Sequence, residues 1–280
     1  LTIRKLAREI VLIDIHEEKT IGEALDIQHG IPDMGISSVR AGTYADCKDC
    51  DLIIITAGRN RKRGESRLDL IAGNSAILKD VVGQMKPYYT KGVIMIVSNP
   101  VDVLVYQCTK WMGLPNGMVF GTGCILDSSR FTRLIADYTH LNTEVVKATI
   151  VGEHGDAQIP IWSRASIAGV PLQEYCENVG LKWDEEIRKE ISDKVREMGA
   201  TIIKGKGRTH YGIATCVCYL AEAVLNQRLT IAPVSTMFQG EYGIEDVCLS
   251  VPSIIGVNGV EKRLEERWAE EEFQAFRQAA

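Results

Sequence analysis

The chain has 280 residues and a mass of 31.0 kDa, enough for one large domain or two smaller ones with a substantial core. Hydrophobic residues make up 45% and charged residues 25%, and every apolar run is too short for a membrane span, so we expect a soluble protein. The net charge of -5 argues against nucleic-acid and membrane partners and favours small-molecule chemistry.

Eight cysteines in a chain of this length indicate free thiols in a reducing compartment, so we expect a cytoplasmic protein. Cys47 and Cys50 form a C-x-x-C pair, which is compatible with half of a zinc site or with a redox pair. No second C-x-x-C or C-x-x-H accompanies this pair in the sequence, and we therefore expect no metal.

The first half of the sequence alternates short apolar runs with helical patterns. Residues 10–15, 52–57 and 93–98 are rich in β-branched side chains, as buried parallel strands are, and residues 69–88 show helical spacing. This alternation predicts an α/β fold of the Rossmann type, with a doubly wound parallel sheet. Ligands of such sheets bind at the carboxyl ends of the strands.

Polar or small residues stand at or just after the ends of these three strands. They are Asp14, Gly58 and Asn99. An acidic residue in the position of Asp14 accepts hydrogen bonds from the adenosine ribose and disfavours a 2'-phosphate, which favours NAD over NADP. The alternative is that Asp14 only caps the following helix.

A cation-rich segment extends from Arg59 to Arg67. Its four arginines and one lysine would repel one another without an anionic partner, which predicts a lid over a ligand. A solvated surface loop is the alternative interpretation.

The second half of the chain shows a different pattern. We predict helices at 128–138, 183–204 and 211–226, a strand at 147–151, and antiparallel strands at 246–251 and 253–257. The sequence therefore divides into a nucleotide-binding domain, residues 1–120, and an α+β substrate domain, residues 121–280. The final residues, 268–280, are typical of an unfinished helix.

His154 stands between two glycines directly after a predicted strand, where its side chain can face a cleft. A lone histidine is more often structural. Asp127 and Arg130, three residues apart on one helical face, would supply an orienting carboxylate and a fork for a substrate carboxylate.

These motifs resemble the L-lactate and malate dehydrogenase family over nearly the whole chain. The resemblance includes Leu-Asp-Ser-Ser-Arg-Phe at 126–131 and Gly-Glu-His-Gly-Asp at 152–156. Further matching segments are 13–15, 24–29, 57–58, 64–67, 98–102, 121–123 and 240–244. Residues 204–214 are similar to bacterial-type L-lactate dehydrogenases.

The resemblance implies an NAD-dependent oxidoreductase of carboxylic acid metabolism, such as the lactate step of glycolysis, that interconverts a short 2-oxo acid and an L-2-hydroxy acid. His154 would transfer the proton, and Asp127 would hold the imidazole and raise its pKa. Arg130 would bind the substrate carboxylate, and Arg67 would polarise the reacting carbonyl.

Other roles follow from the same resemblance. Asn99 would contact both nicotinamide and substrate, and Thr209 would line the substrate pocket. The cofactor groove would be formed by Ala57, Gly58, Val97 and Ile213, together with Asp14. The resemblance also implies a homo-oligomer, either a tetramer or a dimer.

Arg61 occupies the position at which lactate dehydrogenases normally carry Gln and malate dehydrogenases Arg. An arginine there would pair with the second carboxylate of oxaloacetate, which favours malate. Thr209 and the rest of the chain favour lactate. We expect an L-lactate dehydrogenase, with malate dehydrogenase as the alternative.

Two further departures from the family pattern concern regulation and cofactor binding. Thr132 and Lys147 stand where many bacterial lactate dehydrogenases carry the Arg and His that bind fructose 1,6-bisphosphate, so we do not expect that regulation. Residues 1–280 contain no G-x-G-x-x-G turn, and we expect this turn and the first strand to precede residue 1. A non-catalytic relative is the remaining alternative, which the intact set of site motifs disfavours.

Overall fold

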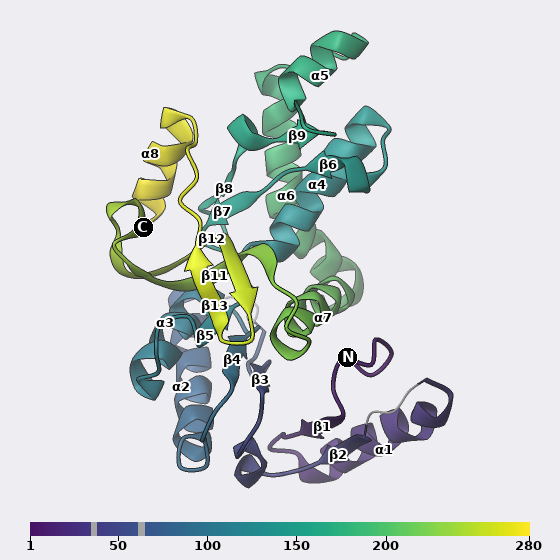
Figure 1. The fold of residues 1–280 in the computed structure, drawn as a ribbon, viewed down its shortest axis with the longest axis vertical. Helices are drawn as coiled ribbons and strands as arrows, with labels where there is room; N and C mark the ends of the chain where they lie inside the picture. The colour runs from purple at the N-terminus through teal and green to yellow at the C-terminus, as the bar shows by residue number, and fades with distance from the viewer. Residues whose placement is uncertain (35–37, 61–64) are drawn as a thin grey trace. The chain divides into compact units, whose positions relative to one another are not determined.

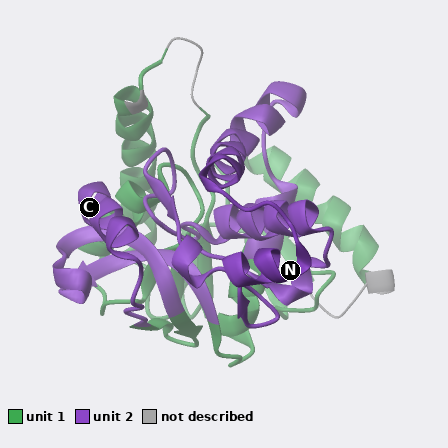
Figure 2. Ribbon diagram, turned by 90° about the horizontal axis from the view of Figure 1, so that it is seen from above, with its two compact units in different colours: residues 1–121, 217–230, 254–262 green, residues 122–216, 231–253, 263–280 purple. Residues whose placement is uncertain are grey.

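The computed structural model describes residues 1–34, 38–60 and 65–280, with the backbone alone for residues 32–34 and 67. The chain forms two compact units (Figure 2). The first contains residues 1–121, 217–230 and 254–262, and the second contains residues 122–216, 231–253 and 263–280. The domain boundary placed after residue 120 in the sequence stays a prediction.

The elements of the first unit alternate between strand and helix (Figure 1). They are β1 (Glu9–Leu12), α1 (Glu17–Met34), β2 (Ser38–Ala41), the short 3-10 helix η1 (Tyr44–Cys47), β3 (Leu52–Ile55), α2 (Arg67–Met85), β4 (Val93–Ile96), α3 (Val101–Met112) and β5 (Val119–Gly121).

The core of this unit is built on β4, which pairs in parallel with β3 and β5. All four residues of β4 are buried, because a strand with a neighbour on each side and helices over its faces has no solvent-facing position. The helix α2 begins at a capping box, in which Ser66 accepts from the Asp69 amide and the Asp69 carboxylate accepts from the Ser66 amide.

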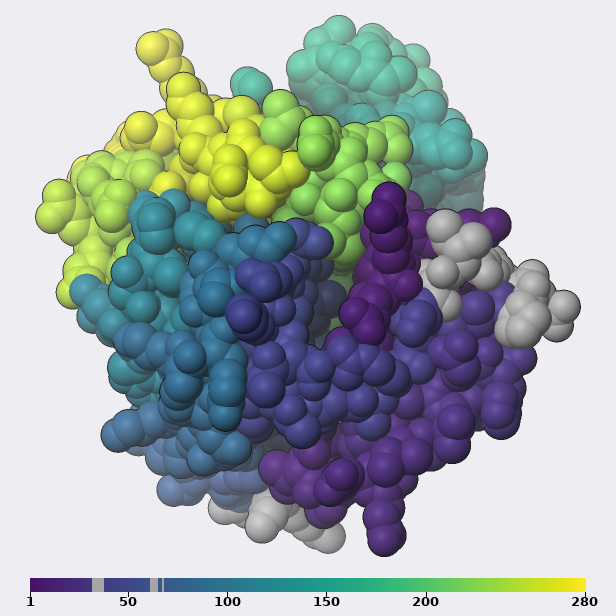
Figure 3. Space-filling model, turned by 60° about the horizontal axis from the view of Figure 1, so that its bottom comes forward, coloured from purple at the N-terminus to yellow at the C-terminus, as the bar shows by residue number. Residues whose placement is uncertain are grey.

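The first two strands form a separate parallel sheet, β1–β2, which is covered by α1. Ala24 and Ile31 of α1 pack with Val39 of β2 in a small core. Ile21 and Leu25, four residues apart on α1, remain exposed. The N-terminal residues, purple in Figure 3, form part of the face drawn there.

The second unit contains shorter strands and most of the remaining helices. These are α4 (Ile125–Thr139), η2 (Thr143–Val145), β6 (Val146–Lys147), β7 (Ile150–Gly152), β8 (Gln158–Pro160), η3 (Trp162–Arg164), β9 (Ser166–Ile167), β10 (Val170–Pro171), α5 (Leu172–Val179), α6 (Glu185–Lys206) and α8 (Glu270–Ala279). Four elements contain residues of both units: α7 (Tyr211–Leu225), β11 (Thr230–Gln239), β12 (Glu245–Gly256) and β13 (Gly259–Arg263).

Two apolar clusters stabilise the second unit. The buried face of α4, including Phe131 and Ile135, packs with Ile191 of α6. Val151 of β7 packs with Phe238 of β11, Val251 of β12 and Phe276 of α8. The strand β7 therefore lies among buried apolar side chains. This packing holds its end in place, and with it the start of the segment that follows β7.

The α/β fold predicted from the sequence is confirmed, with two differences in its strands. Residues 147–151 form parts of two strands, β6 and β7, which belong to different sheets. Residues 246–251 and 253–257 do not form two strands, because β12 continues through Pro252 as one strand of 12 residues. Among the helices that the structure describes, none combines the length and the apolar character needed to cross a membrane.

Candidate active site

The turn after β7 brings His154 to the first turns of α4. The imidazole Nδ1 lies 2.5 Å from Asp127 Oδ2, and Arg130 Nη1 donates to Asp127 Oδ1 at 3.0 Å. We call these three residues the histidine cluster. The spacing of three residues places Asp127 and Arg130 on one side of α4, so that a single carboxylate contacts both the guanidinium and the imidazole.

Burial sets the electrostatics of the histidine cluster. The Asp127 side chain is 4% exposed, whereas that of His154 is 24% exposed. A carboxylate this deeply buried needs partners for its charge, and Arg130 supplies the permanent one. The imidazole of His154 contacts this buried carboxylate and is also partly exposed to solvent. It can therefore exchange a proton with its surroundings while Asp127 keeps its contact with Arg130.

Gly152, the last residue of β7, gives the chain the turn that leads to His154. Its φ is +89°, a conformation that L side chains rarely adopt. A Cβ at this position would lie 2.8 Å from Ile159 Cδ1. Glycine is therefore favoured here by the backbone conformation, and a larger residue would in addition displace the end of the Ile159 side chain.

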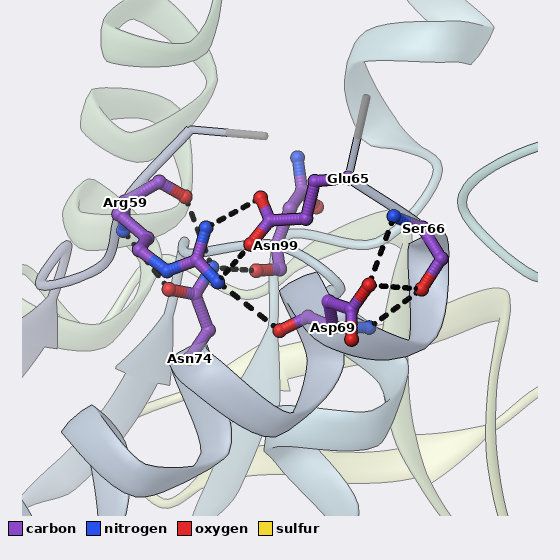
Figure 4. A network of polar contacts seen from close by, with 6 residues as sticks. All are labelled: Arg59, Glu65, Ser66, Asp69, Asn74 and Asn99. Atoms are coloured by element: carbon purple, nitrogen blue, oxygen red, sulfur yellow. Dashed lines mark hydrogen bonds and ion pairs between the residues drawn. The ribbon is translucent and has the colours of Figure 1, made fainter. Parts of the chain in front are cut away.

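A second group of polar contacts lies at the carboxyl ends of β3 and β4 in the first unit (Figure 4). Asn74, 2% exposed on α2, bonds to both loops: its Oδ1 accepts from the Arg59 amide, and its Nδ2 donates to the carbonyls of Arg59 and Asn99. We call Arg59, Glu65, Asn74 and Asn99 the strand-end cluster. Asn74 thus holds the two loops at a fixed separation.

Both terminal nitrogens of Arg59 donate to neighbouring residues of the chain. Its guanidinium binds Glu65 through two contacts of 2.6 Å and donates to the Asp69 carbonyl at 3.1 Å. It lies directly over Gly73, where a Cβ would come within 2.6 Å of Arg59 Nη2. This arginine is therefore held by the protein itself, and the argument that its charge needs an anionic ligand does not apply to it.

The remaining predicted cofactor contacts lie on the surface at the strand ends. Ala57, Gly58 and Asn99 are exposed and Val97 is half-buried. Asp14 is exposed two residues after β1, and its Oδ1 accepts from the His16 amide at 3.0 Å. One oxygen of Asp14 therefore supports the turn into α1, as the capping interpretation predicts, while the carboxylate stays open to solvent.

The other predicted site residues are placed differently. Thr209 is exposed between α6 and α7, and Ile213 is half-buried in the first turn of α7. The structure thus groups Asp127, Arg130 and His154, while Thr209 and Ile213 belong to another part of the same unit. Arg61 and the side chain of Arg67 lie outside the described residues.

Three comparisons with known proteins agree with these motifs. Residues 1–121 match the family described as lactate/malate dehydrogenase, NAD binding domain, and residues 124–280 match the lactate/malate dehydrogenase, alpha/beta C-terminal domain. The chain belongs to the lactate/malate dehydrogenase family. The predicted family, the NAD cofactor and the oxidoreductase class are therefore confirmed.

Individual relatives extend the similarity to the full chain. An L-lactate dehydrogenase of Acetivibrio thermocellus is 39% identical over 100% of this chain and 88% of its own length. One of Thermoanaerobacterium saccharolyticum is 42% identical over 97% of this chain and 88% of its own length. The crystal structure of a minor L-lactate dehydrogenase from Enterococcus mundtii is also similar, with a TM-score of 0.93 and 38% identity. The match covers 98% of this chain and 87% of the Enterococcus mundtii chain.

The strand ends of the first unit fit an NAD cofactor. Parallel strands bind dinucleotides at their carboxyl ends. The ends of β3 and β4 present exposed backbone (Ala57 and Gly58) and an amide side chain (Asn99), and the end of β1, in the separate β1–β2 sheet, is followed by the Asp14 carboxylate. These groups supply the hydrogen-bonding and close-approach surfaces that a ribose and a nicotinamide ring need.

The C-x-x-C pair gives no support to redox or metal chemistry. Burial and then the neighbouring Cys50 raise the pKa of Cys47 to about 11, which disfavours the thiolate that both chemistries need. Within the described residues, no group of three or more His, Cys, Asp or Glu side chains is arranged to hold a metal ion.

Sequence reasoning missed Asn74 and Ser128. Asn74 lies in the middle of a helix, where only its helix-breaking tendency hints at a special contact. Ser128 is adjacent to Asp127 and binds the backbone of β7. Its signal in the sequence was its place between two predicted site residues, which does not reveal the direction of the side chain.

Proposed function

We propose that this protein is an NAD-dependent L-lactate dehydrogenase that interconverts pyruvate and L-lactate. The observation that carries the proposal is the 2.5 Å contact between His154 Nδ1 and the buried Asp127 carboxylate, which is shared with Arg130. The full-length similarity to relatives named L-lactate dehydrogenase favours lactate over malate.

In this mechanism, bound NADH supplies the hydride to the keto carbon of pyruvate. Because Nδ1 of His154 is bound to Asp127, Nε2 is the nitrogen that donates the proton to the keto oxygen. The reverse reaction returns a proton to the same atom. Asp127 fixes the orientation of the ring and stabilises its protonated form.

Arg130 would bind the substrate carboxylate. Its guanidinium has five N–H groups, and the contact with Asp127 uses Nη1, so it has the capacity for a second, bidentate partner. We assign the polarisation of the keto oxygen to Arg67. We assign further substrate contacts to Asn99 and Thr209, and cofactor contacts to Asp14, Ala57, Gly58, Val97 and Ile213.

The experiment is a spectrophotometric assay of the full-length protein with NADH and either pyruvate or oxaloacetate. We expect a higher kcat/KM for pyruvate. Absence of NADH oxidation with both acids would favour a non-catalytic relative instead.

Malate dehydrogenase is the second candidate because of Arg61, and the Arg61→Gln variant distinguishes the two. If Arg61 discriminates between the substrates, Arg61→Gln increases the preference for pyruvate at least about tenfold, or roughly 1.4 kcal/mol. A higher kcat/KM for oxaloacetate than for pyruvate in the wild type would overturn the lactate assignment.

We also propose a homo-oligomer, a tetramer or a dimer, that acts in the cytoplasm. The exposed pair Ile21 and Leu25 on α1 supports burial of this helix between subunits, and eight cysteines without a disulfide support a reducing compartment. Light scattering of the wild type and of Leu25→Glu tests the assembly. A wild-type monomer would contradict it.

A further inference from the structure

One face of α4, together with its N-cap residue Cys124, bonds in regular steps to the segment that leads to His154. Ser128 Oγ accepts from the Ile150 amide at 2.8 Å, Thr132 Oγ1 donates to the Ala148 carbonyl at 3.4 Å, and Cys124 Sγ lies 3.7 Å from the Gly152 carbonyl. Each step of four residues along the helix corresponds to two residues along the extended segment, in the opposite direction. We call these three side chains the α4 row.

The two step lengths match, which explains why the contacts repeat. Four helical residues advance about 6.0 Å, and two extended residues advance about 6.6 Å. Residues four apart on a helix share a face, and alternate residues of a strand direct their backbone groups to the same side. The α4 row therefore fixes the helix against the strand at three successive points.

Ser128 makes the shortest contact of the α4 row, and it satisfies a buried donor. The carbonyl of Thr149 accepts from the Ile161 amide, next to β8, so the amide of Ile150 faces the other side of the strand. Ile150 is 1% exposed, and its amide would be costly to leave without an acceptor. The hydroxyl of Ser128 provides that acceptor.

We propose that Ser128 is a positioning residue that sets the distance between Asp127 and His154. Asp127 immediately precedes Ser128 on α4, and His154 follows β7 by two residues, so the Ser128 contact joins the two parts of the chain that carry the proton-transferring pair. This inference rests on the proposed function. Ser128 acts through Asp127 and His154, since its hydroxyl is directed at the backbone of β7.

The test compares the same substitution at two adjacent positions. Ser128→Ala removes the contact with β7, whereas Ser129→Ala removes a bond to the Ile125 carbonyl within α4 and a hydrogen bond with Cys216 of α7, and leaves β7 unaffected. We expect Ser128→Ala to lower kcat for pyruvate reduction about tenfold while KM for pyruvate and NADH changes less than about twofold, because small misplacements of catalytic groups reduce the rate steeply. Ser129→Ala should retain wild-type kinetics.

Ser128→Thr keeps the hydroxyl and should recover most of the lost kcat. Equal kcat in Ser128→Ala and Ser129→Ala, or a loss in Ser128→Ala that Ser128→Thr does not recover, would overturn the inference. A wild type that reduces neither oxo acid would instead contradict the proposed function, so the two failures are distinguishable.

A second pair of variants decides the question if Ser128→Ala does not fold. Thr132→Val removes the contact with Ala148, whereas Thr139→Val removes a bond within α4, from Oγ1 to the Ile135 carbonyl at 2.8 Å. We expect kcat to fall about twofold to threefold in Thr132→Val relative to Thr139→Val, with unchanged KM. Identical kcat in these two variants would contradict a positioning role for the α4 row.

Discussion

The histidine cluster and the strand-end cluster each contain an arginine bound to a carboxylate, yet the two carboxylates differ in whether they also bind a second side chain. Glu65 accepts twice from one guanidinium, while Asp127 accepts once from Arg130 and once from His154. Asp127 therefore couples a permanent cation to a group that can gain or lose a proton. An ion pair whose carboxylate binds only the arginine has a structural role. An ion pair whose carboxylate also binds an imidazole can support proton transfer.

Replacement of the imidazole should have the largest effect on activity. His154→Gln keeps a polar side chain but removes the group that donates the proton, so we expect kcat for pyruvate reduction to fall about 10³-fold. NADH affinity, measured by fluorescence titration, should change less than about twofold. The control is His140→Asn, at the exposed end of α4, where asparagine tolerates the φ of +57°. A His154→Gln enzyme with near wild-type kcat would show that the histidine cluster, like the strand-end cluster, takes no part in proton transfer.

Asp127→Asn should have the next largest effect, because it removes the charge that Arg130 and His154 share. We expect kcat/KM for pyruvate to fall about 10²-fold and the free energy of unfolding to fall by about 3 kcal/mol, since Arg130 remains mostly buried. Urea unfolding and steady-state kinetics measure the two changes. Asp137→Asn, on the exposed side of the same helix, should alter neither by much. An unchanged unfolding curve for Asp127→Asn would show that burial of the pair is unimportant.

Asn74→Ala should mainly affect the cofactor. It removes three hydrogen bonds that hold the loops after β3 and β4, so we expect a loss of about 1–3 kcal/mol of stability and a KM for NADH raised several-fold. The kcat should change less than in the variants of the histidine cluster. The matched control is Ser75→Ala, whose buried hydroxyl has no hydrogen-bond partner among the described residues. Equal KM values for NADH in Asn74→Ala and Ser75→Ala would contradict a role in shaping the cofactor edge.

Glu65→Gln should have the smallest effect. The pair with Arg59 is partly exposed, 30% for the arginine and 16% for the glutamate, so solvent and salt screen it. We expect KM for NADH to change less than about threefold, and the difference from wild type to disappear at 1 M salt. A large loss of kcat would mean that the strand-end cluster takes part in chemistry.

The positions of some residues and strands could be predicted from the sequence, and those of others could not. The grouping of His154 with Asp127 was predictable because glycines, a preceding strand and an Arg three residues after the Asp occur together. The segment 147–151 was harder, because one apolar run contains the end of β6 and the start of β7, and hydrophobicity does not indicate the break at Ala148 and Thr149. The two strands predicted on either side of Pro252 are one strand, because β12 continues through this residue.

The arginines of the cation-rich segment were treated as one class in the sequence, and the structure shows that Arg59 is paired with Glu65. Charge counting cannot show that Glu65 would return to bind Arg59, since that contact depends on the path of the chain between them. Interactions that depend on the direction of a single side chain, such as those of Ser128 and Asn74, likewise need coordinates.

The packing of Arg59 over Gly73 links two positions 14 residues apart into one shared volume. A methyl group at position 73 would occupy part of the space of the guanidinium, which would have to shift away from its present place beside Glu65. A smaller residue at position 59 would release that space. Homologous sequences should therefore show covariation between these positions, with a residue larger than glycine at 73 accepted only where the arginine at 59 has been replaced.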